Sequence, residues 1–258
     1  MKYLSGLLLL LALHSAQALE RWQQDAYLVE SFHQVALKRE YQDKGQDHFN
    51  RWRQPVRIRL VNEVGDKPLQ ADVVKIQAAH LSHITGHSVT LVQDPAKANL
   101  TLVMTRRSQV TRWARQLMGQ SPSIQAALAD GLCIANYVTD QEGAIRRASI
   151  IIPVDASRDQ GRFLDCVVEE LTQVMGLPND SDAVFPSIFN DRSTDSFLTG
   201  LDYLLLKMAY HPALTPGMTQ AEVDAALPAV LRSLKAQGDI LQANRRVQEH
   251  SLKRWAGL

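Results

Sequence analysis

The stretch that decides the fold is Cys166-Val-Val-Glu-Glu-Leu-Thr-Gln-Val-Met-Gly-Leu-Pro-Asn-Asp180. Its apolar residues recur at helical spacing up to Gly176, and a polar loop follows. We therefore expect an amphipathic helix that ends at this glycine. Glu169 and Gln173 are four residues apart, so they project from one face of the helix, with Glu170 beside them.

The polar positions of this stretch have the spacing of the extended zinc motif H-E-x-x-H-x-x-G-x-x-H. Glu169, Gln173 and Asn179 stand at the three histidine positions, and Glu170 stands where the motif has its general base. Zinc in proteins favours imidazole and thiolate ligands, whereas Gln173 and Asn179 offer only neutral amide oxygens. We therefore expect no catalytic zinc here and no activity as a zinc peptidase.

Three interpretations of these residues stay open. In the first, Glu169, Gln173 and Asn179 form a hydrogen-bonded polar cluster that holds the helix to the loop. In the second, these residues line a ligand-binding cleft together with Glu170 and Asp180. In the third, Glu169, Gln173 and Asn179 hold a hard cation such as calcium, which accepts carboxylate and amide oxygens, and Glu170 is the general base of a hydrolase.

His80, His83 and His87 form a second set of candidate metal ligands. Their spacing places them on one helical face only if the helix continues past Gly86, which is a plausible helix end. We therefore favour a hydrogen-bonded His80 at the edge of the core, with His83 and His87 in solvent.

Residues 1–18 have the pattern of a cleaved export signal. Lys2 provides a short positive region, residues 7–13 are apolar, and residues 16–18 (Ala-Gln-Ala) fit the A-x-A cleavage pattern. The apolar run is far shorter than the roughly 20 residues that a membrane-spanning helix needs. We expect a mature protein that starts near Leu19, has no transmembrane span and lies in the periplasm or outside the cell.

The charges of the chain are balanced, with 28 Lys and Arg residues against 27 Asp and Glu residues. Removal of residues 1–18 takes away only Lys2 among them and leaves equal numbers. A neutral protein has no bulk positive charge for a phosphate backbone, so we expect no nucleic-acid partner.

The chain contains two cysteines, Cys133 and Cys166. In an oxidising compartment such a pair favours a disulfide, and two buried free thiols are the alternative. Closing a loop of about 33 residues would contribute roughly 4 kcal/mol in the chain-entropy model.

The pattern of the remaining chain alternates between strands and helices. Alternation of apolar and charged residues predicts a half-buried strand at 52–60, and β-branched runs predict further strands. Apolar residues at helical spacing and capping signals predict the helices. The expected strands are 52–60, 89–92, 98–104, 132–138 and 148–154, and the expected helices are 69–84, 161–175, 201–210, one that begins at 219, and a charged helix or pair over 229–255.

This order of elements is similar to that of small zinc-dependent peptidases of the metzincin group. The segments at 97–102 and 149–152 resemble two of their strands, and Ser187-Ile188-Phe189 resembles the segment that carries their Met-turn, with Phe189 in place of the methionine. Residues 198–202 resemble the start of their closing helix. The resemblance implies a mixed sheet with a central motif helix.

Three segments also resemble a bacterial family, domain of unknown function 2927. They are Glu169-Glu170-Leu171-Thr172-Gln173, the segment 176–180, and Pro186-Ser187-Ile188-Phe189-Asn190-Asp191. This resemblance implies an exported protein and leaves the chemistry open.

We therefore expect an α+β fold with a metzincin- or zincin-like mixed sheet at 51–215. Helical extensions are expected at 19–50 and 216–258. The expected function is that of a non-catalytic exported protein whose cleft binds a peptide or another envelope component. The alternative is a metal-dependent hydrolase with oxygen ligands and Glu170 as general base.

Overall fold

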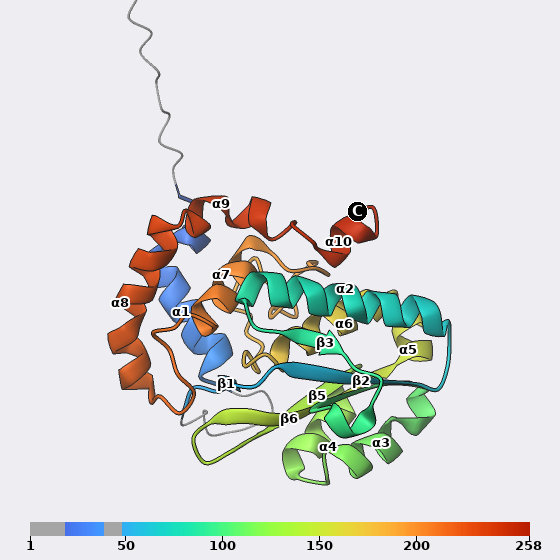
Figure 1. The fold of residues 1–258 in the computed structure, drawn as a ribbon. Coiled ribbons are helices and arrows are strands. Elements are labelled where there is room, and N and C mark those ends of the chain that lie inside the picture. Colours follow the sequence, from blue (N-terminus) through green and yellow to red (C-terminus); the bar gives the residue numbers. More distant parts are fainter. Residues whose placement is uncertain (1–18, 39–47) are drawn as a thin grey trace, which may run out of the picture.

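The computed structural model describes residues 19–38 and 48–258 and shows a mixed α/β fold around a six-stranded sheet (Figure 1). The order β1-β6-β4-β2-β3 is parallel throughout, and β5 pairs antiparallel with β6. The sheet is therefore mixed, as the sequence predicted. The predicted export signal at 1–18 lies outside the described residues, as does the segment 39–47 of the predicted N-terminal extension. The strands are β1 (Arg51–Trp52), β2 (Val56–Asn62), β3 (Val89–Leu91), β4 (Leu100–Thr105), β5 (Ile134–Thr139) and β6 (Ala144–Pro153).

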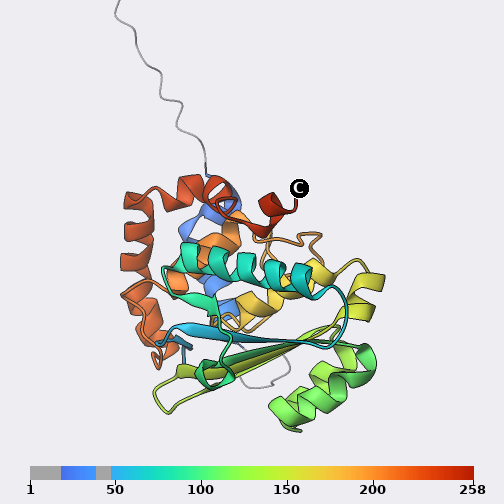
Figure 2. The same cartoon turned by 45° about the vertical axis from the view of Figure 1, so that its right-hand side comes forward.

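Helices cover the sheet and one of its ends. Figures 1 and 2 show α2 and α6 on one face and the pair α3 and α4 below the other, while α1, α7 and α8 gather at one end. In the described part of the chain, no helix has both the length and the apolar character that crossing a bilayer requires. The helices are α1 (Asp25–Ala36), α2 (Lys67–Thr85), α3 (Val110–Leu117), α4 (Pro122–Asp130), α5 (Val154–Asp159), α6 (Phe163–Gln173), α7 (Gly200–Ala209), α8 (Gln220–Ala236), α9 (Asp239–Arg246) and α10 (Leu252–Trp255).

The two faces of the sheet are covered unequally. The larger core lies on the face of α2, α6 and α7, whereas a smaller core under α3 and α4 includes Ile134, Val103 and Ile151 from β5, β4 and β6. Strands that are apolar on both faces are typical of sheets covered on both sides. On β2, by contrast, Arg57 and Arg59 alternate with buried apolar residues, so this end of the second face stays polar.

The segment 105–130, for which the sequence analysis predicted no helices, forms α3 and α4. Trp113 of α3 is partly buried against the smaller core and donates a hydrogen bond from Nε1 to Glu63 Oε2 at 3.0 Å. The guanidinium of Arg112 lies 4.9 Å from the centre of the Trp113 ring. A helical signal was present in the sequence, since the buried Val110 and Ala114 of α3 are four residues apart.

The end of α6 is fixed by a close approach to the chain before β1. Gly176 has φ +112°, and a Cβ at this position would lie 2.3 Å from the carbonyl oxygen of Asn50. Trp52 Nε1 donates to the carbonyl of Val174 at 2.7 Å, and Tyr210 Oη donates to the carbonyl of Met175 at 2.9 Å. Only glycine fits both this conformation and this contact.

The predicted disulfide between Cys133 and Cys166 is present. It joins the residue before β5 to the first turn of α6, with a sequence separation of 33 residues. The edge strand and the motif helix are therefore covalently connected.

We expect the double variant Cys133→Ser/Cys166→Ser to lose about 4 kcal/mol of unfolding free energy, because the unfolded chain regains the entropy of the open loop. Guanidinium unfolding under non-reducing conditions measures the difference. Wild-type protein treated with a reductant should unfold at the same midpoint as the double variant. Equal midpoints for oxidised wild type and variant would contradict the expectation.

Candidate functional site

A cleft of about 400 Å³ lies between α4, β5, α6 and the loops that follow α6. The disulfide lies in its wall, since Cys133 and Cys166 both line it. Every residue from 130 to 137 also lines the cleft, so the edge strand β5 forms one side of it. The charged residues of the lining are Asp130, Arg162, Glu169, Glu170, Asp180 and Asp191.

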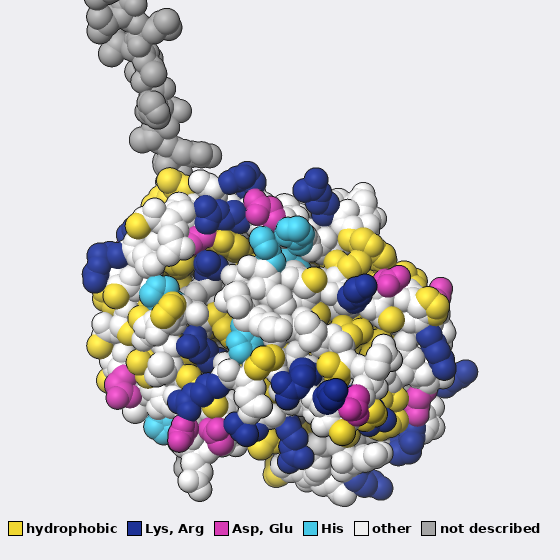
Figure 3. All heavy atoms as spheres, in the orientation of Figure 1, with side chains coloured by type: hydrophobic (Ala, Val, Ile, Leu, Met, Phe, Trp, Pro, Cys, Tyr) yellow, Lys and Arg dark blue, Asp and Glu magenta, His cyan; other side chains and the backbone are white. Residues whose placement is uncertain are grey.

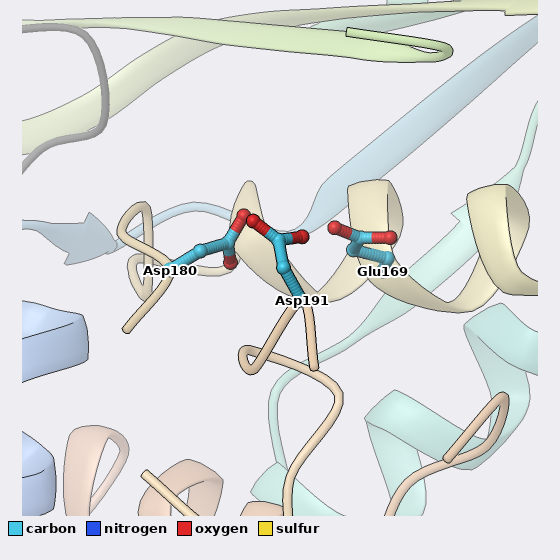
Figure 4. A group of neighbouring side chains, drawn as sticks. All are labelled: Glu169, Asp180 and Asp191. Atoms are coloured by element: carbon cyan, nitrogen blue, oxygen red, sulfur yellow. The ribbon is translucent and has the colours of Figure 1, made fainter. Parts of the chain in front are cut away.

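Three carboxylates meet in this cleft. One oxygen each from Glu169, Asp180 and Asp191 lie within 4.8 Å of one another. Figure 4 shows that Glu169 extends from α6, whereas Asp180 and Asp191 reach it from two parts of the following loop. Arg162 Nη2 lies 3.8 Å from Glu169 Oε2 and offsets part of the negative charge.

Hydrogen bonds within the loop bring its two carboxylates together. The N–H of Ser181 donates to the carbonyl of Phe189 at 2.7 Å, and the Phe189 side chain is fully buried. Asn190 Nδ2 donates to the carbonyls of Asp182 and Val184 at 3.1 and 3.0 Å. The residue before Ser181 and the residue after Asn190 are therefore held side by side.

A buried carboxylate of α7 anchors this loop from below. Asp202 accepts hydrogen bonds from Ser187 Oγ (2.5 Å), from the N–H of Ile188 (3.2 Å) and from the N–H of Thr199 (2.8 Å). Thr199 and Asp202 also form a capping box at the start of α7. Burial raises the pKa of Asp202 to about 6, although the hydrogen bonds from Ser187, Thr199 and Ile188 oppose this rise.

The predicted site residues of the motif helix face the cleft. Glu170 is 5 % exposed and lines the cleft, as do Glu169 and Gln173. Gln173 Nε2 donates to both oxygens of Asp180, at 3.0 and 3.1 Å. The structure thus brings Glu169, Glu170, Gln173 and Asp180 together.

Asn179 lies apart from this group. Its Nδ2 donates to the carbonyl of Gln34 in α1 and to the carbonyl of Asp180, both at 2.8 Å, and its N–H donates to the carbonyl of Val35 at 3.3 Å. It does not belong to the lining of the cleft. Asn179 therefore joins the loop to α1. Asp191, and not Asn179, lies beside Glu169 in the cleft.

The sequence analysis did not identify Asp191 as a site residue. It lies eleven residues beyond Asp180, and no helical or strand spacing connects the two. The sequence did contain one indication of Asp191, namely the composition of the loop. A long segment rich in Asp, Ser and Asn after a motif helix is typical of a functional loop.

A second cavity of about 230 Å³ continues the cleft on the other side of the carboxylates. It shares Arg162, Glu169 and Asp191 with the cleft, so the two spaces meet at these residues. The rest of its lining is almost entirely polar and consists of Asp165, Ile188, Asn190, Ser193, Thr194, Asp195 and Ser196.

The second set of histidines does not gather at one point. His80 is 2 % exposed, and its burial lowers its pKa to about 4, although it is hydrogen-bonded to the backbone of Val247. His83 is exposed, with Nε2 lying 3.6 Å from Glu249 Oε2. His87 differs from the expectation, because it is half-buried and its Nε2 lies 2.7 Å from the carbonyl of Gln54.

The comparisons with known proteins give one match. The model of a family described as protein of unknown function (DUF2927) matches residues 25–229. This range includes α6, the loop after it and α7. No curated protein and no solved structure matches the chain.

The raised pKa of Asp202 predicts a pH dependence of stability. Between its ordinary pKa of 3.8 and about 6, the native state holds a proton that the unfolded chain has released. The contribution of this group to stability is therefore greatest below pH 4 and falls as the pH rises to 6. We expect the unfolding free energy of wild type minus that of Asp202→Asn to decrease over this range by about 3 kcal/mol at most.

Urea unfolding of both proteins at pH 4, 5 and 7 measures this difference. Asp72→Asn is the control, since Asp72 is an exposed residue of α2, and its difference from wild type should stay constant. A constant difference for Asp202→Asn as well would show that folding does not raise the pKa of Asp202.

Proposed function

We propose that this chain, which belongs to the family of proteins of unknown function DUF2927, is an exported protein that binds an extended, cationic peptide segment. The binding site is the cleft between β5 and α6. The scaffold is related to that of metzincin peptidases, but the site does not act as a zinc peptidase. The observation that carries the proposal is an acidic cleft with an edge strand along one side.

The position of β5 supports binding of an extended chain. β4 and β5 pair with the same residues of β6, from 148 to 151, so β5 lies at the edge of the sheet. In the described part of the chain β5 pairs with β6 alone, and its other side borders the cleft. An edge strand beside a groove can bind a peptide as an additional strand through backbone hydrogen bonds.

The charges of the cleft support a cationic ligand. Its lining contains five carboxylates and one guanidinium. Glu169, Asp180 and Asp191 lie close enough to repel one another when ionised. A Lys or Arg side chain placed among them would relieve this repulsion.

The order of elements supports a scaffold of the metzincin type. The segment from β2 through α2, β3, β4 and the β5–β6 hairpin to α6 follows the order that the sequence resemblance implies, with α3 and α4 inserted before the hairpin and α5 after it. The residues at the motif positions do not fit zinc, because Gln173 and Asn179 offer only neutral amide oxygens, whereas zinc favours imidazole and thiolate ligands. The NH₂ groups of both amides donate hydrogen bonds to protein oxygens.

Peptide binding can be tested with a fluorescein-labelled peptide of alternating Lys and Val residues in a fluorescence anisotropy titration. We expect the double variant Asp130→Asn/Asp191→Asn to bind about tenfold more weakly, because an ion pair near the surface is worth up to about 1 kcal/mol. Two further peptides carry N-methyl groups on the odd-numbered or on the even-numbered residues. One of them should lose binding and the other should keep it, because a strand directs alternate N–H groups to its neighbour.

The matched control is Asp72→Asn/Asp159→Asn, which removes two exposed carboxylates outside the cleft. It should bind the peptide as wild type does. Absence of binding by wild type, or equal weakening in both double variants, would refute the proposal.

A second candidate function follows from the three carboxylates. Their oxygens suit a hard cation such as calcium, which takes several oxygen ligands, and Glu170 lines the same cleft. In this case the protein would be a metal-dependent hydrolase with Glu170 as general base.

For this second candidate we expect about one equivalent of calcium per chain in an isothermal titration, and its loss in Asp191→Asn. Elemental analysis of the purified protein should find no zinc. Stoichiometric zinc, together with peptide hydrolysis that disappears in Glu170→Gln, would overturn the proposed binding function. Absence of calcium binding by wild type would exclude the second candidate alone.

A further inference from the structure

Among the described residues, α3 and α4 cover only part of the second sheet face, and the rest of this face is polar and positively charged. We call it the open sheet face. Val103 and Ile151 belong to the smaller core, so their side chains point to the second face of the sheet. Side chains alternate between the two faces along a strand, so every second residue from these two, and the residues that pair with them, lie on the same face. The residues of the open sheet face are Arg57 and Arg59 (β2), Thr90 (β3), Thr101 (β4), Asn136 and Val138 (β5), and Arg147 and Ser149 (β6).

The strand register aligns these side chains in rows. Arg59 pairs with Thr101, Thr101 with Ser149, and Ser149 with Asn136, which gives one polar row across four strands. Strands lie about 4.8 Å apart, so the row spans roughly 14 Å. This length suits an extended ligand better than a single small anion.

The charges of this face are all of one sign. Arg59 and Arg147 are exposed, and Arg57 is half-buried with its Nε donating to the carbonyl of Lys97. The ion pairs found among the described residues include none of these three guanidinium groups. Figure 3 shows several Lys and Arg side chains on the lower half of the molecule, with Asp and Glu side chains among them.

We propose that the open sheet face binds an acidic polysaccharide. Guanidinium groups pair with carboxylates through charge-assisted hydrogen bonds. The hydroxyl and amide groups of Thr101, Ser149 and Asn136 can exchange hydrogen bonds with sugar hydroxyls. The flat row of four strands provides the length along which successive sugars lie.

The composition of the face disfavours other polyanions. None of its residues is aromatic, whereas single-stranded nucleic acids are bound by stacking on aromatic side chains. Its one exposed apolar side chain is Val138, at 52 % exposure, which gives little to insert into a lipid surface. The open sheet face shares Asn136 with the lining of the peptide cleft, whereas Arg57, Arg59 and Arg147 lie outside that lining.

The test uses fluorescein-labelled polygalacturonate and the full mature protein in an anisotropy titration at low and at physiological salt. We expect saturable binding that weakens with salt, and a loss of about tenfold or more in Arg59→Gln/Arg147→Gln, which removes two charge-assisted contacts. The matched control is Arg232→Gln/Arg254→Gln, a pair of exposed residues on α8 and α10 with the same change of charge.

Several outcomes would overturn the proposal. One is the absence of binding by wild type. Another is a control pair that weakens binding as much as the test pair does, which would indicate an effect of bulk charge. Single-stranded DNA or vesicles of phosphatidylglycerol that bind more tightly than polygalacturonate, with the same dependence on Arg59 and Arg147, would assign the face to those ligands. Binding of the cationic peptide should be equal in both Arg variants.

Discussion

The arrangement of the site depends on the close approach between the end of α6 and the chain before β1. Gly176 lies so near to Asn50 that a side chain would collide with the backbone carbonyl. Trp52 and Tyr210 fix the two carbonyls that precede this glycine. Because the helix has to end there, the chain turns at once into the loop that carries Asp180. The last turns of α6 then face the same space as the loop.

The disulfide and Asp202 determine the distance between the parts of the site. The covalent bond at Cys133 holds the edge strand to the first turn of α6, so the cleft cannot widen freely on that side. Asp202 holds the far part of the loop through donors from Ser187, Ile188 and Thr199. The loop therefore presents Asp191 from a fixed base, although Asp191 itself is exposed. Rigid support beneath an exposed ligand-binding loop lowers the entropy lost on binding.

The sequence predicted the parts of the fold that rest on local patterns. Alternation in β2, the Pro and Gly at the ends of α2, and the capping box of Thr219 each leave a mark within a few residues. The disulfide was predicted from the two cysteines together with the expectation of export. The contacts of Asp191 and Asn179 left no such mark, because they arise where a loop without regular spacing folds back on α6 and α1. Such a loop takes its shape from tertiary hydrogen bonds, and those appear only in three dimensions.

Gln173 determines what the last turn of α6 presents to the cleft. A histidine at position 173 would present a lone pair to a metal, whereas Gln173 presents an N–H₂ group to both oxygens of Asp180. The glutamine therefore orients the carboxylate of Asp180, which lines the cleft. Negative charge is contributed by both the helix and the loop, since Asp180 and Asp191 meet Glu169 there. A site built from three carboxylates attracts cations in general, so selectivity between a peptide side chain and a metal ion has to come from the edge strand and the shape of the cleft.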